Sequence, residues 1–121
     1  MQKLLPYATF KDERGRFLGI TQDPWGEVNF IETRSGHTRG NHYHKETREL
    51  FFIISGEIEV SIEDVRTGNR EEFVGRKGDM FVVDIYEKHT FFTKSDSRWI
   101  NMLSQPIDAD NPDFHTSEQP G

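Results

Sequence analysis

The chain has 121 residues, of which 33% are hydrophobic and 30% charged, with a formal net charge of −6 and no cysteine. This length fits one domain, and the missing thiols exclude disulfides, zinc–thiolate sites and cysteine nucleophiles. The acidic balance argues against a nucleic-acid partner, and the absence of a signal peptide or a membrane-length apolar run leads us to expect a cytoplasmic protein with no membrane partner.

The first half of the chain is expected to form short strands. Residues 10–20 break at a turn and resume as a strand, and residues 26–34, "GEVNFIETR", form a strand closed by the turn at 35–36. The stretch "LFFIISG", residues 50–56, is apolar at both parities, so its strand must be covered on both faces. A neighbouring sheet or a second subunit could supply that cover, and we expect a homodimer.

The second half continues in the same way. Residues 57–63, "EIEVSIE", alternate strictly between apolar and polar side chains, which is typical of a half-buried antiparallel strand. No stretch has helical spacing. Frequent turns between short strands predict an all-β sandwich or barrel in a single domain, residues 1–121. The other expected segments are strands at 80–85 and 98–103, turns at 64–72, 75–79 and 95–97, a barrel spanning residues 10–104, and a tail, 105–121, that frays towards its end.

Four residues are candidate metal ligands. His42 and His44 are two positions apart, so an extended strand directs both to one face. A turn at residues 45–48 would reset the parity and let Glu49 begin the next strand beside them. His89 is the fourth candidate, at the far end of the strand that starts after residue 78. Three imidazoles and a carboxylate suit zinc, iron, manganese or nickel, among which the spacing does not choose.

The spacing of these residues resembles the two motifs of the cupin superfamily. The second motif is similar at Gly78 and His89, although Asp84 and Tyr86 stand where proline and glycine are usual. The resemblance covers roughly residues 28–103 and implies a small antiparallel β-barrel of jelly-roll type. The first motif is matched throughout by Gly36, five residues, His42-x-His44, four residues, Glu49, six residues and Gly56.

Two kinds of cupin are similar in more detail. The segments "TRGNHYH" and "DNPDFH" resemble the carboxy-terminal domain of bacterial capsular polysaccharide enzymes that act on UDP-linked keto sugars. The run from Arg39 to Lys45 and the early "DERGRFLGI" also resemble the dTDP-4-keto-6-deoxyhexose 3,4-ketoisomerases. The first resemblance implies zinc held by His42, His44, Glu49 and His89; the second implies His42 and His44 as a metal-free acid–base pair. Because Glu49 is present, we expect a metal, with zinc preferred.

Both resemblances imply an enzyme of surface polysaccharide biosynthesis. The expected activity is that of a nucleotide-linked keto-sugar epimerase or isomerase, which moves a proton on the carbon beside a carbonyl. If a metal occupies the histidines, another group must be the base, and His37, Tyr43 and Lys45 are candidates. Further alternatives are an iron-dependent dioxygenase and a non-catalytic sugar-binding cupin.

The substrate of such an enzyme carries a diphosphate, which needs positive charge. Between residues 34 and 48 the chain has four basic residues and one acidic residue, against the net charge of −6. Arginine matches phosphate oxygens well, so Arg39, Lys45 and Arg34 are the expected substrate-binding residues for a nucleotide sugar or another small anionic carbohydrate. The alternative is a solvated turn with no ligand.

Overall fold

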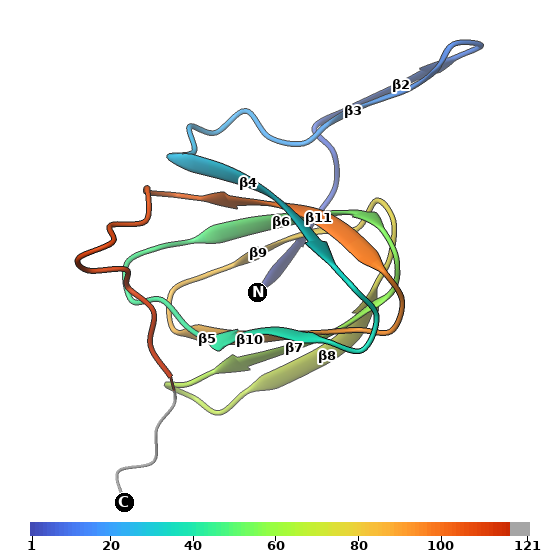
Figure 1. Cartoon of the computed structure of the whole chain (residues 1–121). Helices are drawn as coiled ribbons and strands as arrows, with labels where there is room; N and C mark the ends of the chain where they lie inside the picture. Colours follow the sequence, from blue (N-terminus) through green and yellow to red (C-terminus); the bar gives the residue numbers. More distant parts are fainter. Residues whose placement is uncertain (117–121) are drawn as a thin grey trace, which may run out of the picture.

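The computed structural model describes residues 1–116, and these form strands joined by turns (Figure 1). None of the described residues lies in a helix, as the sequence predicts, so no helix there could cross a membrane. The strands are β1 (Gln2–Leu4), β2 (Ala8–Asp12), β3 (Gly15–Gly19), β4 (Glu27–Thr33), β5 (Thr38–His42), β6 (Glu49–Ser55), β7 (Ile58–Asp64), β8 (Arg70–Gly75), β9 (Met80–Val83), β10 (Glu87–Thr93) and β11 (Ser97–Leu103).

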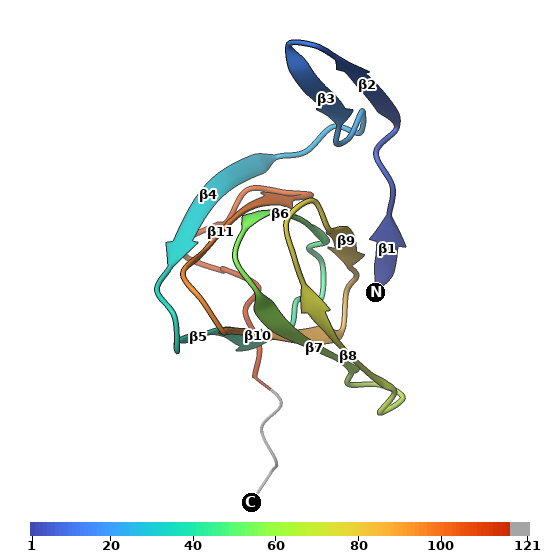
Figure 2. The ribbon, with the colours of Figure 1, turned by 90° about the vertical axis from the view of Figure 1, so that its right-hand side faces the viewer.

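Two antiparallel sheets face each other around a common interior (Figures 1 and 2). One sheet has five strands in the order β1-β9-β6-β11-β4, and the other has four in the order β5-β10-β7-β8. The two sheets share no strand, so the hydrogen bonding does not close into a continuous barrel. The prediction of an all-β, single-domain jelly roll is confirmed, in the form of two packed sheets.

The hydrophobic core lies between the sheets, where strand alternation places it. In β7 the predicted inward residues are all buried, while the intervening ones face outward. Phe92, whose neighbour Phe91 is buried, points outward and is 39% exposed. The core consists of Phe51, Ile53, Ile58, Val60, Ile62, Phe81, Val83, Phe91 and Trp99.

Strand β6 is buried on both faces, as its composition requires. Phe51 faces the core, whereas Leu50 on the opposite face is only 1% exposed. Ile20 and Trp25, from the segment between β3 and β4, pack against the cluster that contains Leu50. The chain itself therefore supplies most of the second cover for β6.

The hairpin of β2 and β3 projects away from the two sheets (Figures 1 and 2). Its turn lies at the break predicted from the sequence, with Gly15 at a φ of 138°. Phe10 and Phe17 lie side by side on it, with ring centroids 5.7 Å apart, and they are 67% and 54% exposed. A two-stranded hairpin with exposed aromatic side chains is marginally stable by itself in water.

The segment before His89 differs from the prediction. Strand β9 ends at Val83, and a turn separates it from β10, so His89 lies near the start of a new strand. Tyr86, which occupies the place of the usual cupin glycine, has a φ of 63° in the left-handed region. Its main-chain N–H donates to the carbonyl of His44 at 2.7 Å, which holds this turn beside the β5–β6 loop.

Candidate metal centre

Three histidines and one glutamate converge between the sheets. His42 ends β5 and is paired with His89 of β10, while Glu49 begins β6 in the opposite sheet. His44 lies in the loop that joins β5 to β6. The donor atoms of the four side chains all lie within 4.8 Å of one another. The structure thus brings together the four residues that the sequence singles out as ligands.

The end of β5 is shaped by residues in the left-handed region. Gly40 has a φ of 84° and Asn41 a φ of 63°. A Cβ atom at Gly40 would lie 2.7 Å from the carbonyl oxygen of His89, which is closer than side-chain carbons approach an oxygen. Glycine therefore allows β5 to lie against β10 and to bend so that His42 faces inward.

Glu49 is a buried carboxylate with partners on both oxygens. It is 3% exposed; its Oε1 contacts Nε2 of His44 and lies 3.4 Å from Nε2 of His89. Asn101 Nδ2 donates to the other oxygen, Oε2, at 3.0 Å. Burial opposes the charged form, but hydrogen bonds from His44 and His89 outweigh it and hold the pKa of Glu49 well below its usual range.

The neighbouring histidines have opposite pKa shifts. Burial, with the positive charges that His89 and His44 can carry, lowers the pKa of His42 to about 4, so its imidazole is neutral at pH 7. Burial also opposes the charge on His44, but the Glu49 carboxylate and the Asp113 carbonyl raise its pKa. His44 is therefore the imidazole that favours a proton on both ring nitrogens.

The donor set fits a divalent metal ion. Bonds of about 2.0–2.2 Å to nitrogen and oxygen place ligand atoms roughly 3.3–4.4 Å apart, so four donor atoms that all lie within 4.8 Å of one another are near enough to share one ion. Nδ1 of His44 lies 2.8 Å from the carbonyl of Asp113, and Nδ1 of His89 lies 3.2 Å from that of Glu87. Each carbonyl can accept the Nδ1 proton, which leaves Nε2 of both rings for an ion.

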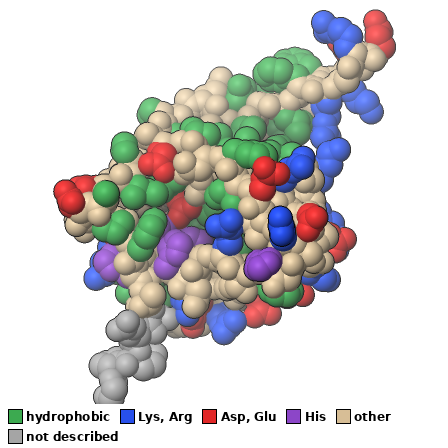
Figure 3. Space-filling model, in the orientation of Figure 1, with side chains coloured by type: hydrophobic (Ala, Val, Ile, Leu, Met, Phe, Trp, Pro, Cys, Tyr) green, Lys and Arg blue, Asp and Glu red, His purple; other side chains and the backbone are tan. Residues whose placement is uncertain are grey.

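A cavity of about 290 Å³ opens beside this centre. Histidine side chains are visible at the surface on this face of the molecule (Figure 3). His44 does not line the cavity, so it lies behind the other three candidate ligands. The cavity is lined by His42, Glu49, His89, Thr38, Arg39, Gly40, Asn101, Ile31, Phe51, Phe91, Trp99, Leu103, Ile107 and Phe114.

Of the predicted substrate-binding residues, only Arg39 lines this cavity. Its Nε donates to the hydroxyl of Thr33 at 2.7 Å, and a second nitrogen donates to the carbonyl of Glu32 at 3.3 Å, so the guanidinium spans from β5 to β4. Arg34 lines a separate hollow together with Arg98. Lys45 lies in the exposed turn that follows His44.

The three candidates for a separate base are also outside the cavity. His37 is exposed on the segment before β5. Tyr43 lies against Tyr86, with ring centroids 6.0 Å apart, and Lys45 follows in the turn. None of these side chains lines the cavity wall.

Sequence reasoning missed three residues beside the centre: Asn101, Asp113 and Phe114. Asn101 shares the inward face of β11 with Trp99 and Leu103, so a polar residue on an otherwise apolar face was the available signal. Asp113 and Phe114 lie in the irregular tail, where no periodicity marks them; the available signal was the resemblance of "DNPDFH", which contains both but did not indicate a role for either.

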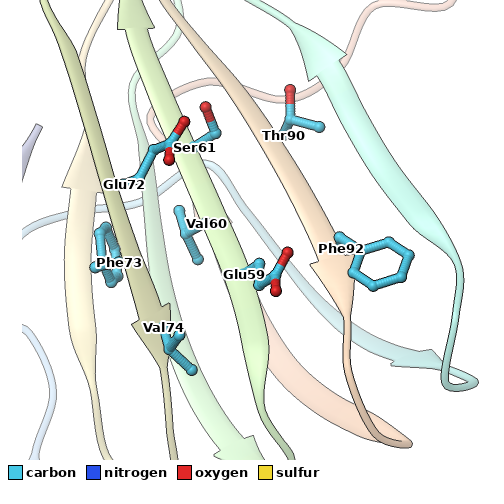
Figure 4. Close-up of a pocket in the computed structure, with 8 residues that line it drawn as sticks. All are labelled: Glu59, Val60, Ser61, Glu72, Phe73, Val74, Thr90 and Phe92. Carbon is cyan, nitrogen blue, oxygen red and sulfur yellow. The ribbon is translucent and has the colours of Figure 1, made fainter.

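A second hollow, of about 450 Å³, lies on the outer face of β7, β8 and β10 (Figure 4). Its lining includes the carboxylates of Glu59 and Glu72 together with Phe92, but no histidine, lysine or arginine. Two carboxylates repel an anionic ligand, so this surface does not suit a sugar nucleotide.

The sequence and the fold agree with a known family. Residues 10–113 match the family described as the polysaccharide biosynthesis C-terminal domain. The chain belongs to this family. The match includes all four residues of the centre, and the cupin resemblance seen in the motifs extends to the whole fold.

One curated relative of this polysaccharide biosynthesis domain is UDP-2-acetamido-2,6-beta-L-arabino-hexul-4-ose reductase from Pseudomonas aeruginosa. The two sequences are 28% identical over 110 residues, which is 86% of this chain and 29% of the relative. The chain therefore spans less than a third of that enzyme's length.

Solved structures of similar fold include three proteins. The capsular polysaccharide assembling protein CapF from Staphylococcus aureus has a TM-score of 0.72 at 24% identity, covering 96% of this chain and 34% of CapF. A dTDP-6-deoxy-D-glucose-3,5-epimerase from Legionella pneumophila, in complex with dTDP-4-keto-L-rhamnose, has a TM-score of 0.74 at 20% identity. The match covers 87% of this chain and 66% of the epimerase. A 3,4-ketoisomerase from Helicobacter canadensis has a TM-score of 0.75 at 16% identity, and the match covers 91% of this chain and 86% of the ketoisomerase. These likenesses establish the cupin fold of the domain.

Proposed function

We propose that this polysaccharide biosynthesis domain binds a divalent metal, preferably zinc, and acts as an epimerase or isomerase of a nucleotide-linked keto sugar. The observation that carries the proposal is the convergence of His42, His44, Glu49 and His89 within 4.8 Å, beside a cavity that all of them except His44 line. The names of the relatives support the substrate class. One is a reductase of a UDP-linked hexulose, and another was solved with dTDP-4-keto-L-rhamnose.

The chemistry is the movement of a proton on the carbon next to a ketone. Removing that proton places negative charge on the carbonyl oxygen, and a bound divalent ion would supply the positive charge that stabilises it. Phe51, Phe91 and Trp99 form apolar walls that exclude water from the reacting atoms. Arg39, at the cavity wall, is the group that would bind the diphosphate of the substrate.

The proton acceptor must be an ionisable group that reaches the cavity. Besides Arg39, whose guanidinium stays protonated, the described residues of that kind are His42, Glu49 and His89. His42 is neutral at pH 7 because its pKa is lowered to about 4, and it is less buried than the other two. We assign it the role of proton acceptor in the metal-free protein only, because a metal-bound imidazole has its lone pair engaged and the base would then have to be another group.

The metal-free ketoisomerase is the second candidate function. It is favoured by the opposite charge preferences of His42 and His44, whose ring centroids lie 5.0 Å apart, since one neutral and one protonated imidazole form an acid–base pair. His44, however, is 1% exposed and does not line the cavity. A buried His44 suits a metal ligand better than a group that transfers a proton to substrate.

We also propose that the protein is a homodimer. Val28 and Phe30 point outward from β4, at one edge of the five-stranded sheet, and are 60% and 58% exposed. Together with the exposed Phe10 and Phe17 of the hairpin, they offer apolar surface within the first 30 residues of the chain. Apolar surface of this kind is typical of an interface between subunits.

The metal content of the purified protein tests the proposal, by elemental mass spectrometry beside a His42→Ala/His44→Ala variant. His37→Ala is the matched control, because it removes an exposed imidazole outside the cavity. We expect near-stoichiometric zinc, nickel, manganese or iron that only the double variant loses. If the protein takes up no metal even after incubation with these ions, the metal-free ketoisomerase becomes the better explanation.

Turnover is tested separately, by incubating UDP- and dTDP-linked 4-keto sugars with the protein in D₂O and following exchange by NMR. Deuterium entering the carbon beside the ketone supports the epimerase or isomerase. Binding without exchange would instead indicate a non-catalytic cupin, and oxygen uptake that requires added iron would indicate a dioxygenase.

A further inference from the structure

The segment that follows β11 returns to the centre from the far end of the sequence. We define residues 108–115 as the carboxyl-terminal strap. Its His115 forms an antiparallel bridge with Tyr43, with main-chain hydrogen bonds of 2.9 and 3.0 Å, so the strap lies alongside the β5–β6 loop. We propose that Asp113 and Phe114 of this strap are positioning residues of the centre, which set the orientation of His44 and His42; the inference rests on the metal site proposed above.

The side chain of Asp113 ties the strap to the loop that carries His44. Its carboxylate accepts hydrogen bonds from the main-chain N–H groups of Lys45, Glu46 and Thr47 at 2.9, 2.8 and 3.1 Å. The hydroxyl of Thr47 donates to it as well, at 3.0 Å. Burial opposes this charge, but the donors outweigh it and lower the pKa of Asp113 to about 2. Asp113 therefore holds the turn that lets Glu49 begin the next strand, although Asp113 lies 64 positions after Glu49 in the sequence.

The main chain of Asp113 acts on His44 directly. Its carbonyl oxygen lies 2.8 Å from Nδ1 of His44, and the residue has a φ of 57°, in the left-handed region that aspartate tolerates better than most residues. That conformation lets one residue turn its carboxylate to the loop and its carbonyl to the imidazole. Since the carbonyl accepts the Nδ1 proton, the Nε2 atom of His44 is directed at Glu49 and at the place of the ion.

Phe114 acts on the other histidine of the pair. Its ring stacks on His42, with centroids 4.9 Å apart at an interplanar angle of 30°, and lies 5.3 Å from the ring of His44. It also lines the cavity, where it remains 46% exposed. The phenyl ring restricts the rotation of His42 and forms part of the cavity mouth.

A strap that served stability alone would leave metal affinity unchanged at temperatures where the fold is intact. Fixing the second nitrogen of a metal-binding histidine instead changes the affinity itself, typically ten- to a hundredfold. The test is the zinc affinity of Asp113→Ala in the full chain, measured by competition with a chromophoric chelator well below the melting temperature of each variant. Asp110→Ala is the matched control, since it removes an exposed carboxylate from the same strap.

We expect Asp113→Ala to bind zinc ten- to a hundredfold more weakly and Asp110→Ala to bind it like the original protein. Asp113→Asn, which keeps one side-chain oxygen as an acceptor, should recover part of the loss. In the metal-free protein, the ¹⁵N shifts of His44 should change from a fixed to an averaged proton distribution in Asp113→Ala. This NMR readout and Phe114→Ala, for which we expect weaker zinc binding, keep the test open if the alanine variant at 113 proves unstable.

Equal zinc affinity in the original protein, Asp113→Ala and Phe114→Ala would overturn the inference and leave the metal site standing. Failure of the original protein to bind any divalent metal would overturn the metal site itself, and the positioning role with it. The two failures are therefore distinguishable in one set of titrations.

Discussion

Asn101 of β11 donates a hydrogen bond of 3.0 Å to Oε2 of Glu49, the oxygen that does not face the histidines. This bond leaves Oε1 directed at His44 and His89. We predict that Asn101→Ala lowers metal affinity about tenfold, because the carboxylate gains rotational freedom. Asn29→Ala, at the position paired with Asn101 on β4, is the control. Equal chelator-competition curves for the two variants would show that Asn101 does not orient Glu49.

The pH dependence of metal binding follows from the shifted pKa of His44. Since that pKa is raised above 6.5, the imidazolium dominates between pH 5 and 6.5, and an ion must displace its Nε2 proton. Glu49, with a lowered pKa, stays ionised there, and His42, at about 4, stays neutral. The apparent affinity should thus rise with pH over this range, by up to about tenfold per pH unit. Titrations that show no pH dependence there would contradict the raised pKa.

Nucleotide binding should depend on one arginine of the basic segment. Arg39→Ala should weaken UDP or dTDP binding about tenfold or more in calorimetry, since hydrogen bonds to charged groups contribute about 1.5–3 kcal/mol. Arg34→Ala is the matched control, because its side chain lines a different hollow. If both variants lose binding equally, the nucleotide does not occupy the cavity beside His42.

Alanine substitutions at two glycines can distinguish the cost of a left-handed backbone from the cost of a steric overlap with a neighbouring strand. Gly36 and Gly40 have φ values of 83° and 84°, but only Gly40 lies against the His89 carbonyl. Both alanine variants should lose about 1–2 kcal/mol of unfolding free energy from the left-handed conformation. Gly40→Ala should lose about 1–3 kcal/mol more from the overlap. Urea denaturation measures the difference, and equal losses would mean that β5 moves away from β10 at no cost.

The exposed aromatic side chains of the hairpin test the dimer. Phe10→Ser/Phe17→Ser should shift the protein from dimer to monomer in sedimentation velocity at micromolar concentration, because both rings are more than half exposed in one chain. Phe92→Ser, on the outer face of the four-stranded sheet, should leave the dimer intact. If the unsubstituted protein sediments as a monomer, the proposal that it forms a homodimer is wrong.

The fold was largely predictable because strand periodicity is a local property. The alternation of residues 57–63 places Ile58, Val60 and Ile62 in the core of the structure, as the sequence predicts. The His42, His44 and Glu49 spacing was equally local, within eight residues. The strand predicted at residues 80–85 was wrong in its extent, since β9 ends at Val83 and a turn at 85–86 follows, in which Tyr86 has a left-handed φ that its residue type does not signal.

The parts of the site that could not be predicted depend on long-range contacts. The bond between His44 and Asp113 joins residues 69 positions apart and uses a main-chain carbonyl, which every residue possesses. The separation of Arg34 from Arg39 into different hollows likewise follows from the crossing of β5 away from β4, not from their nearness in sequence. The end of the tail, where fraying is expected, lies beyond the described residues.

The candidate ligands belong to both layers of the fold: His42 and His89 to the four-stranded sheet, Glu49 to the five-stranded one. A single ion held by them would therefore act as a crosslink between two sheets that share no strand. The chain has no cysteine with which to make a covalent crosslink of that kind. Filling the centre would thus join the two halves of the jelly roll, so that the ion at the proposed substrate site would also keep the sheets from separating.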